Sequence, residues 1–328
     1  MRFSLFLPTI HEGRFIPMGS LDPGHVLDLA QATEELGYDG LWLGEFMESQ
    51  DDVKRQYEDP PAYYAPLTVL GMLAARTQRL RLTTGVLVLP YHDPLILARE
   101  FATLDVFSGG RAVLGVGLGG TLDNFLRTRK RNGRIHRGQM MEEAIRAIRL
   151  LWQERRASFV GDYFEFHDVE SFPKPVQCPL PIVIAGGVKG IVERVGRVAD
   201  GWIDTYSPPQ RLRERVGQLH AAALGVGRQG PFEVMRSFYC AIAGSDEAAE
   251  RIRNACTPGG TPTGPPNTAE REFLLVGSPK CIVAQLDRYL DCGLTEINIA
   301  FYHRDIPTAL EQATMFANEV IPAFGSRR

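Results

Sequence analysis

Two side chains that can transfer protons stand at the ends of apolar runs in the first fifty residues. His11 follows the apolar run 3–7, and Glu45 lies near the end of the run 40–46. An imidazole or a carboxylate beside a bound substrate can act as a general acid or base. We therefore interpret Glu45 and His11 as candidate catalytic residues. Two structural roles stay open: His11 as a solvated loop histidine, and Glu45 as the partner of an arginine.

A glycine pair in the middle of the chain indicates anion binding. It lies between the apolar run 182–185 and a segment with helical spacing, 188–198. The first N–H groups of a helix have no acceptor within the helix and bind phosphate well. The candidate anion-binding residues are Ala185, Gly186, Gly187, Val188 and Lys189. The alternative is a tight turn that needs only the backbone freedom of glycine.

Glycines also end the apolar run 112–116. The segment 115–120 does not have the GxGxxG spacing of a dinucleotide-binding turn, and no acidic residue follows at the end of the next strand. We interpret Gly117 and Gly119 instead as positions where a ligand approaches the backbone closely.

Apolar runs alternate with helix-like segments along the chain. Eight runs are typical of strands in a parallel sheet covered by helices: 3–7, 40–46, 82–89, 112–116, 182–185, 202–205, 234–242 and 296–301. Helical spacing is found in 21–36, 65–77, 94–107, 137–152, 188–198, 210–224, 246–256, 279–292 and 306–320. This alternation predicts an α/β fold, the (β/α)8 TIM barrel, with an open doubly wound sheet as the alternative. The barrel places its site at the carboxyl ends of the strands, where the candidate residues stand.

The regular alternation is interrupted three times. We expect residues 1–328 to form a single barrel domain with insertions near 121–136, 153–181 and 257–268. The first insertion is polar and basic, the second ends in a proline-rich stretch, and the third reads TPGGTPTGPPNT, a composition typical of a loop.

Composition excludes several classes of partner. A net charge of −3 over 328 residues gives no electrostatic basis for binding nucleic acid or a membrane surface. The five cysteines have no CxxC spacing and are odd in number, which favours a reducing, cytoplasmic setting. No close-spaced pair of metal ligands is present, so we expect no metal site. A metal-dependent barrel hydrolase built on His11, His92 and His303 is a further alternative; we interpret His92 chiefly as a helix-entry residue.

Several longer segments carry a family resemblance. They are EELGYDGLWLGE, AARTQRLRLTTGVLVLPYHDPLILAREFATLDVFSGGRAVLGVGLGG, HRGQMMEEAIRAIRLLW, PLPIVIAGG, VADGW and LVGSPKCIVAQLDRYLDCGLTEINI. Together they resemble the bacterial luciferase-like oxidoreductases, which use FMN or the deazaflavin F420. The resemblance implies a (β/α)8 barrel with the flavin ring at its open end. It also implies a cis peptide bond between Gly85 and Val86 behind the ring, a ring contact with Gly117 and Gly119, and a phosphate at the loop 185–188.

The sequence departs from this family after the second strand. Many members carry a histidine directly after the glutamate, whereas this chain has Phe46 and Met47 after Glu45. These apolar side chains predict a pocket for a small apolar organic substrate. We place three more side chains in the substrate pocket: Tyr63, Tyr64 and His303.

The resemblance predicts an oxidoreductase or monooxygenase that transfers hydride or oxygen to its substrate. F420 and FMN share a ring system, and F420 adds a long acidic tail. The basic run 127–131 and the glycines after the fourth strand favour F420 over FMN. A flavin-binding barrel without catalysis is the alternative. The apolar segment 65–77 also predicts a homodimer, although the same apolar stripe would cover the barrel.

Overall fold

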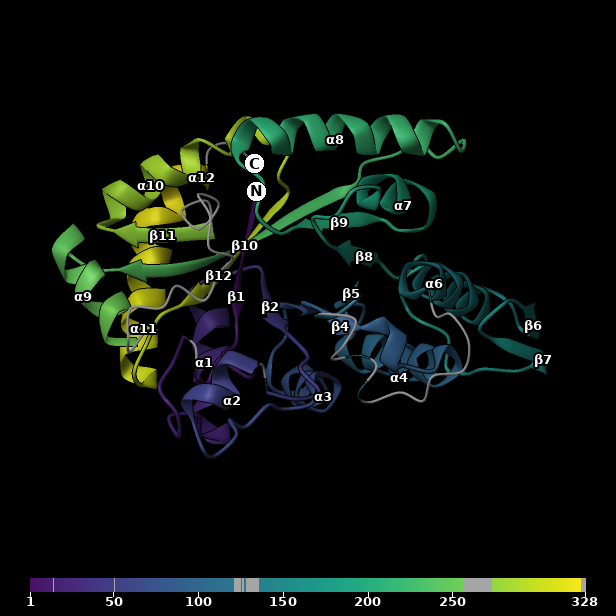
Figure 1. Ribbon diagram of the computed structural model, residues 1–328, viewed down its shortest axis with the longest axis horizontal. Coiled ribbons are helices and arrows are strands. Elements are labelled where there is room, and N and C mark those ends of the chain that lie inside the picture. Colours follow the sequence, from purple (N-terminus) through teal and green to yellow (C-terminus); the bar gives the residue numbers. More distant parts are fainter. Residues whose placement is uncertain are drawn as a thin grey trace.

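The computed structural model describes residues 1–13, 15–49, 51–120, 125, 127, 136–256 and 273–325. Eight parallel strands close into a barrel, as the sequence predicts (Figure 1). Their order is β1 (Arg2–Phe6), β2 (Gly40–Leu43), β3 (Arg81–Thr84), β5 (Ala112–Gly117), β8 (Ile182–Ala185), β9 (Gly201–Asp204), β10 (Glu233–Ile242) and β12 (Glu296–Phe301). The pairing of β10 with β9 and of β12 with β1 closes the ring. The alternative of an open sheet is therefore wrong.

Helices form the outer layer. They are α1 (Pro23–Glu35), α3 (Pro66–Arg76), α4 (Pro94–Ser108), α6 (Arg137–Gln153), α7 (Ile191–Val198), α8 (Pro209–Leu224), α9 (Asp246–Cys256), α10 (Pro279–Asp287) and α11 (Ile306–Met315). Three of them begin at an aspartate whose side chain accepts backbone N–H bonds: Asp22, Asp93 and Asp305. Such a cap, with proline in the first turn, fixes where the helix starts. None of the helices described is long and apolar enough to cross a bilayer.

Several predicted boundaries were wrong. The helix predicted at 188–198 begins only at Ile191, because Gly190 has a φ of 82° and ends the preceding loop. The strand predicted at 82–89 is divided into β3 and β4 (Leu87–Val88), which is followed by the 3-10 turn η1 (Leu89–Tyr91). The helix predicted at 279–292 is split into α10 and the 3-10 turn η3 (Leu290–Cys292). At the C-terminus, α11 continues into the π-helical turn η4 (Phe316–Val320) and α12 (Pro322–Gly325).

The sequence did not reveal four short elements. Within the insertion 153–181, β6 (Ala157–Val160) and β7 (Glu165–Val169) form an antiparallel hairpin at the periphery (Figure 1). The strand β11 (Leu274–Gly277) extends the sheet beside β10, and α2 (Asp51–Gln56) follows β2. The insertion 257–268 and most of 121–136 lie outside the described residues.

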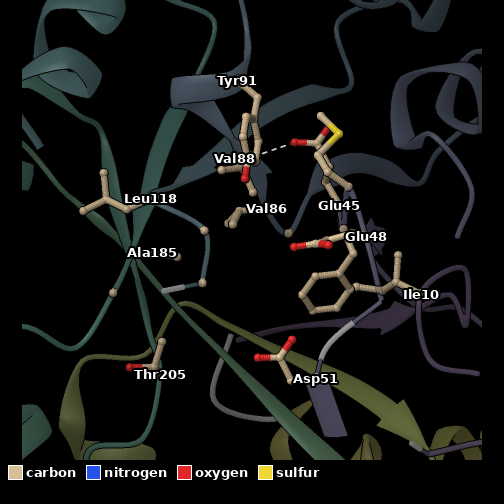
Figure 2. Close-up of a pocket in the computed structure, with 18 of the residues that line it drawn as sticks. Ile10, Glu45, Glu48, Asp51, Val86, Val88, Tyr91, Leu118, Ala185 and Thr205 are labelled. Atoms are coloured by element: carbon tan, nitrogen blue, oxygen red, sulfur yellow. Dashed lines mark hydrogen bonds between the residues drawn. The ribbon is translucent and has the colours of Figure 1, made fainter. Parts of the chain in front are cut away.

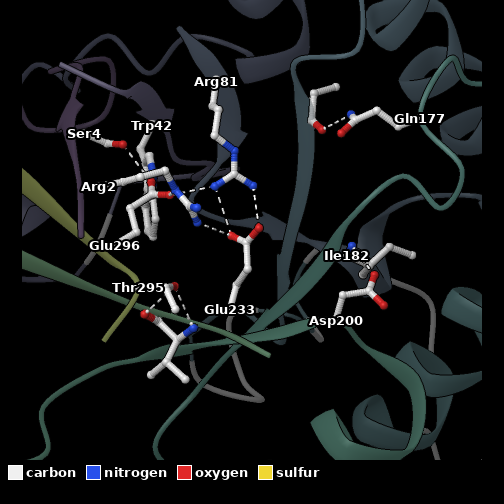
Figure 3. Close-up of polar contacts among 12 residues, drawn as sticks. Arg2, Ser4, Trp42, Arg81, Gln177, Ile182, Asp200, Glu233, Thr295 and Glu296 are labelled. Atoms are coloured by element: carbon white, nitrogen blue, oxygen red, sulfur yellow. Dashed lines mark hydrogen bonds and ion pairs between the residues drawn. The ribbon is translucent and has the colours of Figure 1, made fainter. Parts of the chain in front are cut away.

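An ion cluster centred on one buried glutamate occupies the amino-terminal end of the barrel (Figure 3). Its members are the first residues of four strands: Arg2, Arg81, Glu233 and Glu296. The Glu296 side chain is fully buried and accepts hydrogen bonds from Arg2 Nε at 3.0 Å and Arg81 NH1 at 2.8 Å. Above it, the barrel interior is filled by Trp42, Val113, Val183, Ile203 and Met235. The interior is therefore packed, and open space is left at the carboxyl ends.

Candidate active site

The carboxyl ends of the strands surround a cavity of about 700 Å³, a volume typical of small-molecule sites. Its walls come from the segments after β2, β3, β5, β8 and β9 (Figure 2). It brings together these predicted residues: Glu45, Phe46, Met47, Gly85, Val86, Gly117, Gly119, Ala185 and Gly186. Other predicted residues do not line it: His11, Tyr63, Tyr64, Gly187, Val188, Lys189 and His303.

The interruption of the third strand forms one wall of the cavity. The peptide bond between Gly85 and Val86 is cis, in agreement with the sequence resemblance. Thr84 holds the strand end, because its Oγ1 donates to Gly115 O at 2.8 Å and accepts from Gly115 N at 2.9 Å. Trp42 lies directly behind Gly85: a Cβ there would lie 2.5 Å from Trp42 Cε3. A residue with a Cβ at position 85 would therefore clash with Trp42, so glycine is required there.

The glycines at the end of β5 and directly after it form the adjoining wall. A Cβ on Gly117 would lie 2.8 Å from Val86 Cγ2, and a Cβ on Gly119 would lie 2.7 Å from Val88 Cγ1. Glycine at both positions therefore lets the segment after β5 pack against the third strand. The side chains of Val86, Val88 and Leu118 complete this part of the cavity wall, and an apolar wall suits a flat ring.

Glu45 is fixed at the edge of the cavity. Its Oε2 accepts a hydrogen bond from the N–H of Val88 at 2.7 Å, and both carboxylate oxygens lie 3.0 Å from His92 Nε2 (Figure 2 shows the Val88 bond). The Glu45 side chain is 7% exposed and lines the cavity. Glu45 therefore pairs with a histidine, and not with the arginine of the structural alternative. In the sequence, His92 directly precedes the helix start at Asp93, and this position alone did not predict its contact with Glu45.

The loop after β8 carries backbone groups available for an anion. In the described chain, the N–H groups of Gly187, Val188 and Lys189 donate to no acceptor. Helix α7 begins three residues later than predicted, so these amides belong to a loop that precedes the helix. Thr205, which the sequence did not single out, lines the cavity, and its Oγ1 lies 2.6 Å from the position of a Cβ on Gly187.

Ion pairs cover part of the cavity rim. Glu48 lies 2.6 Å from Lys54 Nζ and 3.6 Å from Arg127 NH1, and Asp51 Oδ1 lies 3.4 Å from Arg127 NH1. These ion pairs offset the negative charge of Glu48 and Asp51. Of the basic run 127–131, Arg127 alone lies within the described residues.

Three of the remaining predicted residues, which do not line the cavity, have other contacts. His11 is 5% exposed and lies among aromatic rings, 4.7 Å from the ring centroid of Phe6 and 5.5 Å from that of Phe15. Tyr63 packs against Phe46 with ring centroids 5.5 Å apart. His303 is buried, and its Nδ1 donates to Phe301 O at 2.9 Å. Burial lowers the pKa of His303.

The three histidines considered as metal ligands have different surroundings. His92 bonds to a carboxylate, His303 bonds to a backbone carbonyl, and His11 contacts aromatic rings. In the described part of the chain, no three histidine, cysteine or acidic side chains are grouped so that they could hold a metal ion. The arrangement therefore gives no support to the hydrolase alternative.

Comparison with known proteins agrees with this arrangement. The profile of the luciferase-like monooxygenase family matches residues 1–296. An F420-dependent glucose-6-phosphate dehydrogenase of Kineococcus radiotolerans is 27% identical in an alignment of 333 positions, and the alignment covers 92% of this chain and 93% of that protein.

Two solved structures have the same fold. A monooxygenase from Streptomyces bottropensis is 22% identical, with a TM-score of 0.77 over 99% of this chain and 100% of that one. The F420-dependent tetrahydromethanopterin reductase of Methanopyrus kandleri is 18% identical, with a TM-score of 0.73 over 98% and 99% of the two chains. Because the family profile spans most of the sequence, the chain belongs to the luciferase-like monooxygenase family.

Proposed function

We propose that this protein is an F420-dependent oxidoreductase acting on a small apolar organic substrate. The observation that carries the proposal is the cavity wall of backbone and glycine around Gly85 and Gly117, next to a loop with unbonded amides. When bound, the deazaflavin supplies the hydride chemistry, and the protein supplies binding and orientation. The relative from Kineococcus radiotolerans, named as F420-dependent, supports this choice of cofactor.

The cavity offers separate places for a ring and for a phosphate. Gly85, Val86, Gly117 and Gly119 would lie against the ring, because all four line the cavity and the glycines let the two walls pack closely together. The loop that contains Gly187 would bind the phosphate through its N–H groups, since unbonded amides before a helix favour anions. The exposed Lys189 adds a positive charge to this loop.

Glu45 is the residue that we propose to handle protons. It lines the cavity, and its two hydrogen-bond partners, Val88 and His92, hold the carboxylate in one orientation. A carboxylate in that place can accept a proton from a substrate hydroxyl or return it. His11 stays a prediction, because it does not line the cavity.

The substrate pocket is proposed from the apolar side chains that line the cavity. Ile10 and Phe46 line the cavity, and Ile10 lies on the side toward Glu48 and Asp51 (Figure 2). Those two acids are paired with Lys54 and Arg127, and the remaining charged lining residues are Glu45 and Arg55, so the apolar residues form the part of the cavity that carries no charge. This favours an apolar substrate over a charged one.

FMN is the second candidate cofactor, because it has the same kind of ring and phosphate that the cavity and the loop would hold. Titration of the purified protein with F420 and with FMN, followed by absorbance and fluorescence, distinguishes the two. Binding of F420 in the micromolar range and its reduction by an organic alcohol support the proposal. Binding of neither compound overturns it, and tight binding with no turnover of any substrate supports a non-catalytic barrel.

We also infer a cytoplasmic homodimer. All five cysteines are unpaired, as in a reducing compartment. Met72 on α3 and Phe107 on α4 leave 48% and 80% of their surface exposed, which offers an apolar face to a second copy. Light scattering that gives the mass of one chain at micromolar concentration contradicts the dimer.

A further inference from the structure

We propose that Trp202 and Arg215 are positioning residues for the cofactor phosphate. Their side chains donate hydrogen bonds to the carbonyl groups of Gly186 and Gly187, which therefore point toward the helical layer. The N–H groups of the residues that follow, Gly187 and Val188, then point toward the cavity. The inference rests on the proposed function, because it assigns an orientation to the loop that would bind the phosphate.

Two side-chain donors contact successive residues of the loop. The indole Nε1 of Trp202 donates to Gly186 O at 2.9 Å, and NH2 of Arg215 donates to Gly187 O. Both donors are buried: Trp202 lies in the core between strands and helices, and Arg215, 9% exposed, comes from α8. The Arg215 guanidinium also lies 5.6 Å from the centre of the Trp202 ring, so the two donors support each other.

Peptide geometry converts these two contacts into an anion-binding arrangement. In a trans peptide the C=O of one residue and the N–H of the next point in opposite directions. Because the carbonyl of Gly186 points to Trp202, the N–H of Gly187 points away from the helical layer. The carbonyl of Gly187 points to Arg215, so the N–H of Val188 points the same way. Two adjacent N–H groups with one direction form a concave site for an anion.

The surroundings of the two N–H groups agree with a bound anion. Within the described residues they donate to no acceptor, although the preceding N–H, that of Gly186, donates to Ile203 O at 3.2 Å. Thr205, on the neighbouring strand end, places its hydroxyl beside Gly187 and lines the cavity (Figure 2). A ligand phosphate that reaches the loop from the cavity would therefore find amide donors and a hydroxyl together.

A purely structural role for Trp202 makes a different prediction from a positioning role. If the indole only fills the core, removal of its N–H affects binding of every flavin equally. If it directs the amides, the loss falls on compounds with a phosphate. The affinity of FMN relative to riboflavin, which lacks the phosphate, separates these two cases.

The decisive variant is Trp202→Phe, which keeps an aromatic ring for the core and for Arg215 but has no N–H donor. We expect its FMN affinity to fall about tenfold while its riboflavin affinity stays within about twofold, the effect of one misdirected hydrogen bond to a charged group. The matched control is Trp152→Phe, since Trp152 Nε1 also donates to a backbone carbonyl, Ala98 O at 2.8 Å, in the layer of α4 and α6. The control should leave the FMN-to-riboflavin ratio unchanged.

A second pair of variants serves if Trp202→Phe does not fold. Arg215→Met removes the other carbonyl donor and should lower the same ratio about tenfold. Arg211→Met removes an equal charge from the exposed face of the same helix, and should change the ratio less than about twofold because exposed charges are screened. Equal losses in both arginine variants would show a general charge effect and overturn the inference.

The outcomes for the inference and for the proposed function are distinct. If wild-type protein binds F420 or FMN, prefers FMN to riboflavin, and keeps that preference in Trp202→Phe, the positioning role is wrong and the function stands. If wild-type protein binds F420 but no FMN, the same comparison is made with F420 and its phosphate-free ring and ribityl fragment. If wild-type protein binds none of these compounds, the proposed function itself is wrong.

Discussion

Glu296, at the amino-terminal end of the barrel, accepts a hydrogen bond from the indole N–H of Trp42 at 2.7 Å. The opposite edge of that indole lies against Gly85, where the third strand is interrupted. Glu296 also accepts hydrogen bonds from Ser4 Oγ at 2.7 Å and from Arg81 NH1 at 2.8 Å. The ion cluster and the cavity wall are therefore joined by one side chain, that of Trp42.

Substitution of Glu296 by glutamine should lower the free energy of unfolding by about 3 kcal/mol, because it leaves two buried arginine contacts without their carboxylate. Urea denaturation measures this change. Glu233→Gln is the matched control: Glu233 meets the same arginines, but its side chain is 25% exposed, so a loss of about 1 kcal/mol is expected. Equal losses of unfolding free energy in the two variants would contradict the larger contribution expected from the buried Glu296.

Replacement of Gly117 by alanine should weaken cofactor binding about tenfold. Its Cβ would lie 2.8 Å from Val86 Cγ2 and would push the third strand out of place. Fluorescence titration with F420 or FMN measures the effect. Gly71→Ala, within α3, has no heavy atom within 4 Å of the new Cβ, and should leave binding unchanged while it stabilises the helix by up to about 1 kcal/mol. Unchanged cofactor affinity in Gly117→Ala would show that the cofactor does not bind against this wall.

Glu45→Gln should lower kcat about 100-fold, because the amide cannot take up the substrate proton. The amide oxygen can still accept the N–H of Val88, so cofactor affinity should be preserved. Steady-state kinetics and titration together test both statements. Glu48→Gln provides the comparison, since Glu48 lines the same cavity but is paired with Lys54. A full rate in Glu45→Gln would exclude Glu45 as the proton-handling group.

Phe46→His should shift substrate preference toward polar compounds, because an imidazole replaces an apolar ring in the cavity wall. For a panel of alcohols, we expect the ratio of kcat/KM between apolar and polar members to fall about tenfold. Phe46→Leu keeps the wall apolar and should keep the preference. Unchanged range and rate in Phe46→His would show that the substrate does not touch this residue.

The free energy of unfolding should decrease as the pH falls, because His303 is buried in the folded chain. Burial lowers the pKa of His303, although the bond to Phe301 O opposes the shift. Below the ordinary pKa of 6.5 the unfolded chain binds a proton that the folded chain rejects, so stability falls as the pH falls, by at most about 1.4 kcal/mol per pH unit. Urea denaturation at about pH 7.5 and about pH 5.5 should show a smaller difference in His303→Asn than in wild type. His25→Asn, at an exposed histidine, should behave as wild type does.

The apolar runs were sufficient for the strands, whereas the closed barrel was predicted from the alternation of strands and helices and from the family resemblance. The eight apolar runs are buried on both sides, and this leaves a strong signal in composition. Closure depends on hydrogen bonds between β9 and β10, which no local pattern encodes. The strand β11 was missed because its four residues carry too little pattern.

The cavity was predicted in outline, and its polar contacts were not. Gly117 and Gly186 could be recognised because glycine at a strand end permits backbone conformations and close approaches that other residues do not, and Gly85 was predicted from the family resemblance. The bonds from His92 to Glu45 and from Trp202 to Gly186 depend on side-chain directions set by packing across the barrel. The late start of α7 had a visible signal in Gly190, which the helical spacing of 188–198 outweighed.

The ion cluster of Arg2, Arg81, Glu233 and Glu296 has a kinetic consequence. Together with the side chains that fill the barrel interior, it closes the amino-terminal side of the barrel, so that in the described part of the chain molecules reach the cavity from the carboxyl ends of the strands. Whichever compound lies deeper must enter first and leave last, so the order of arrival and departure follows from the architecture.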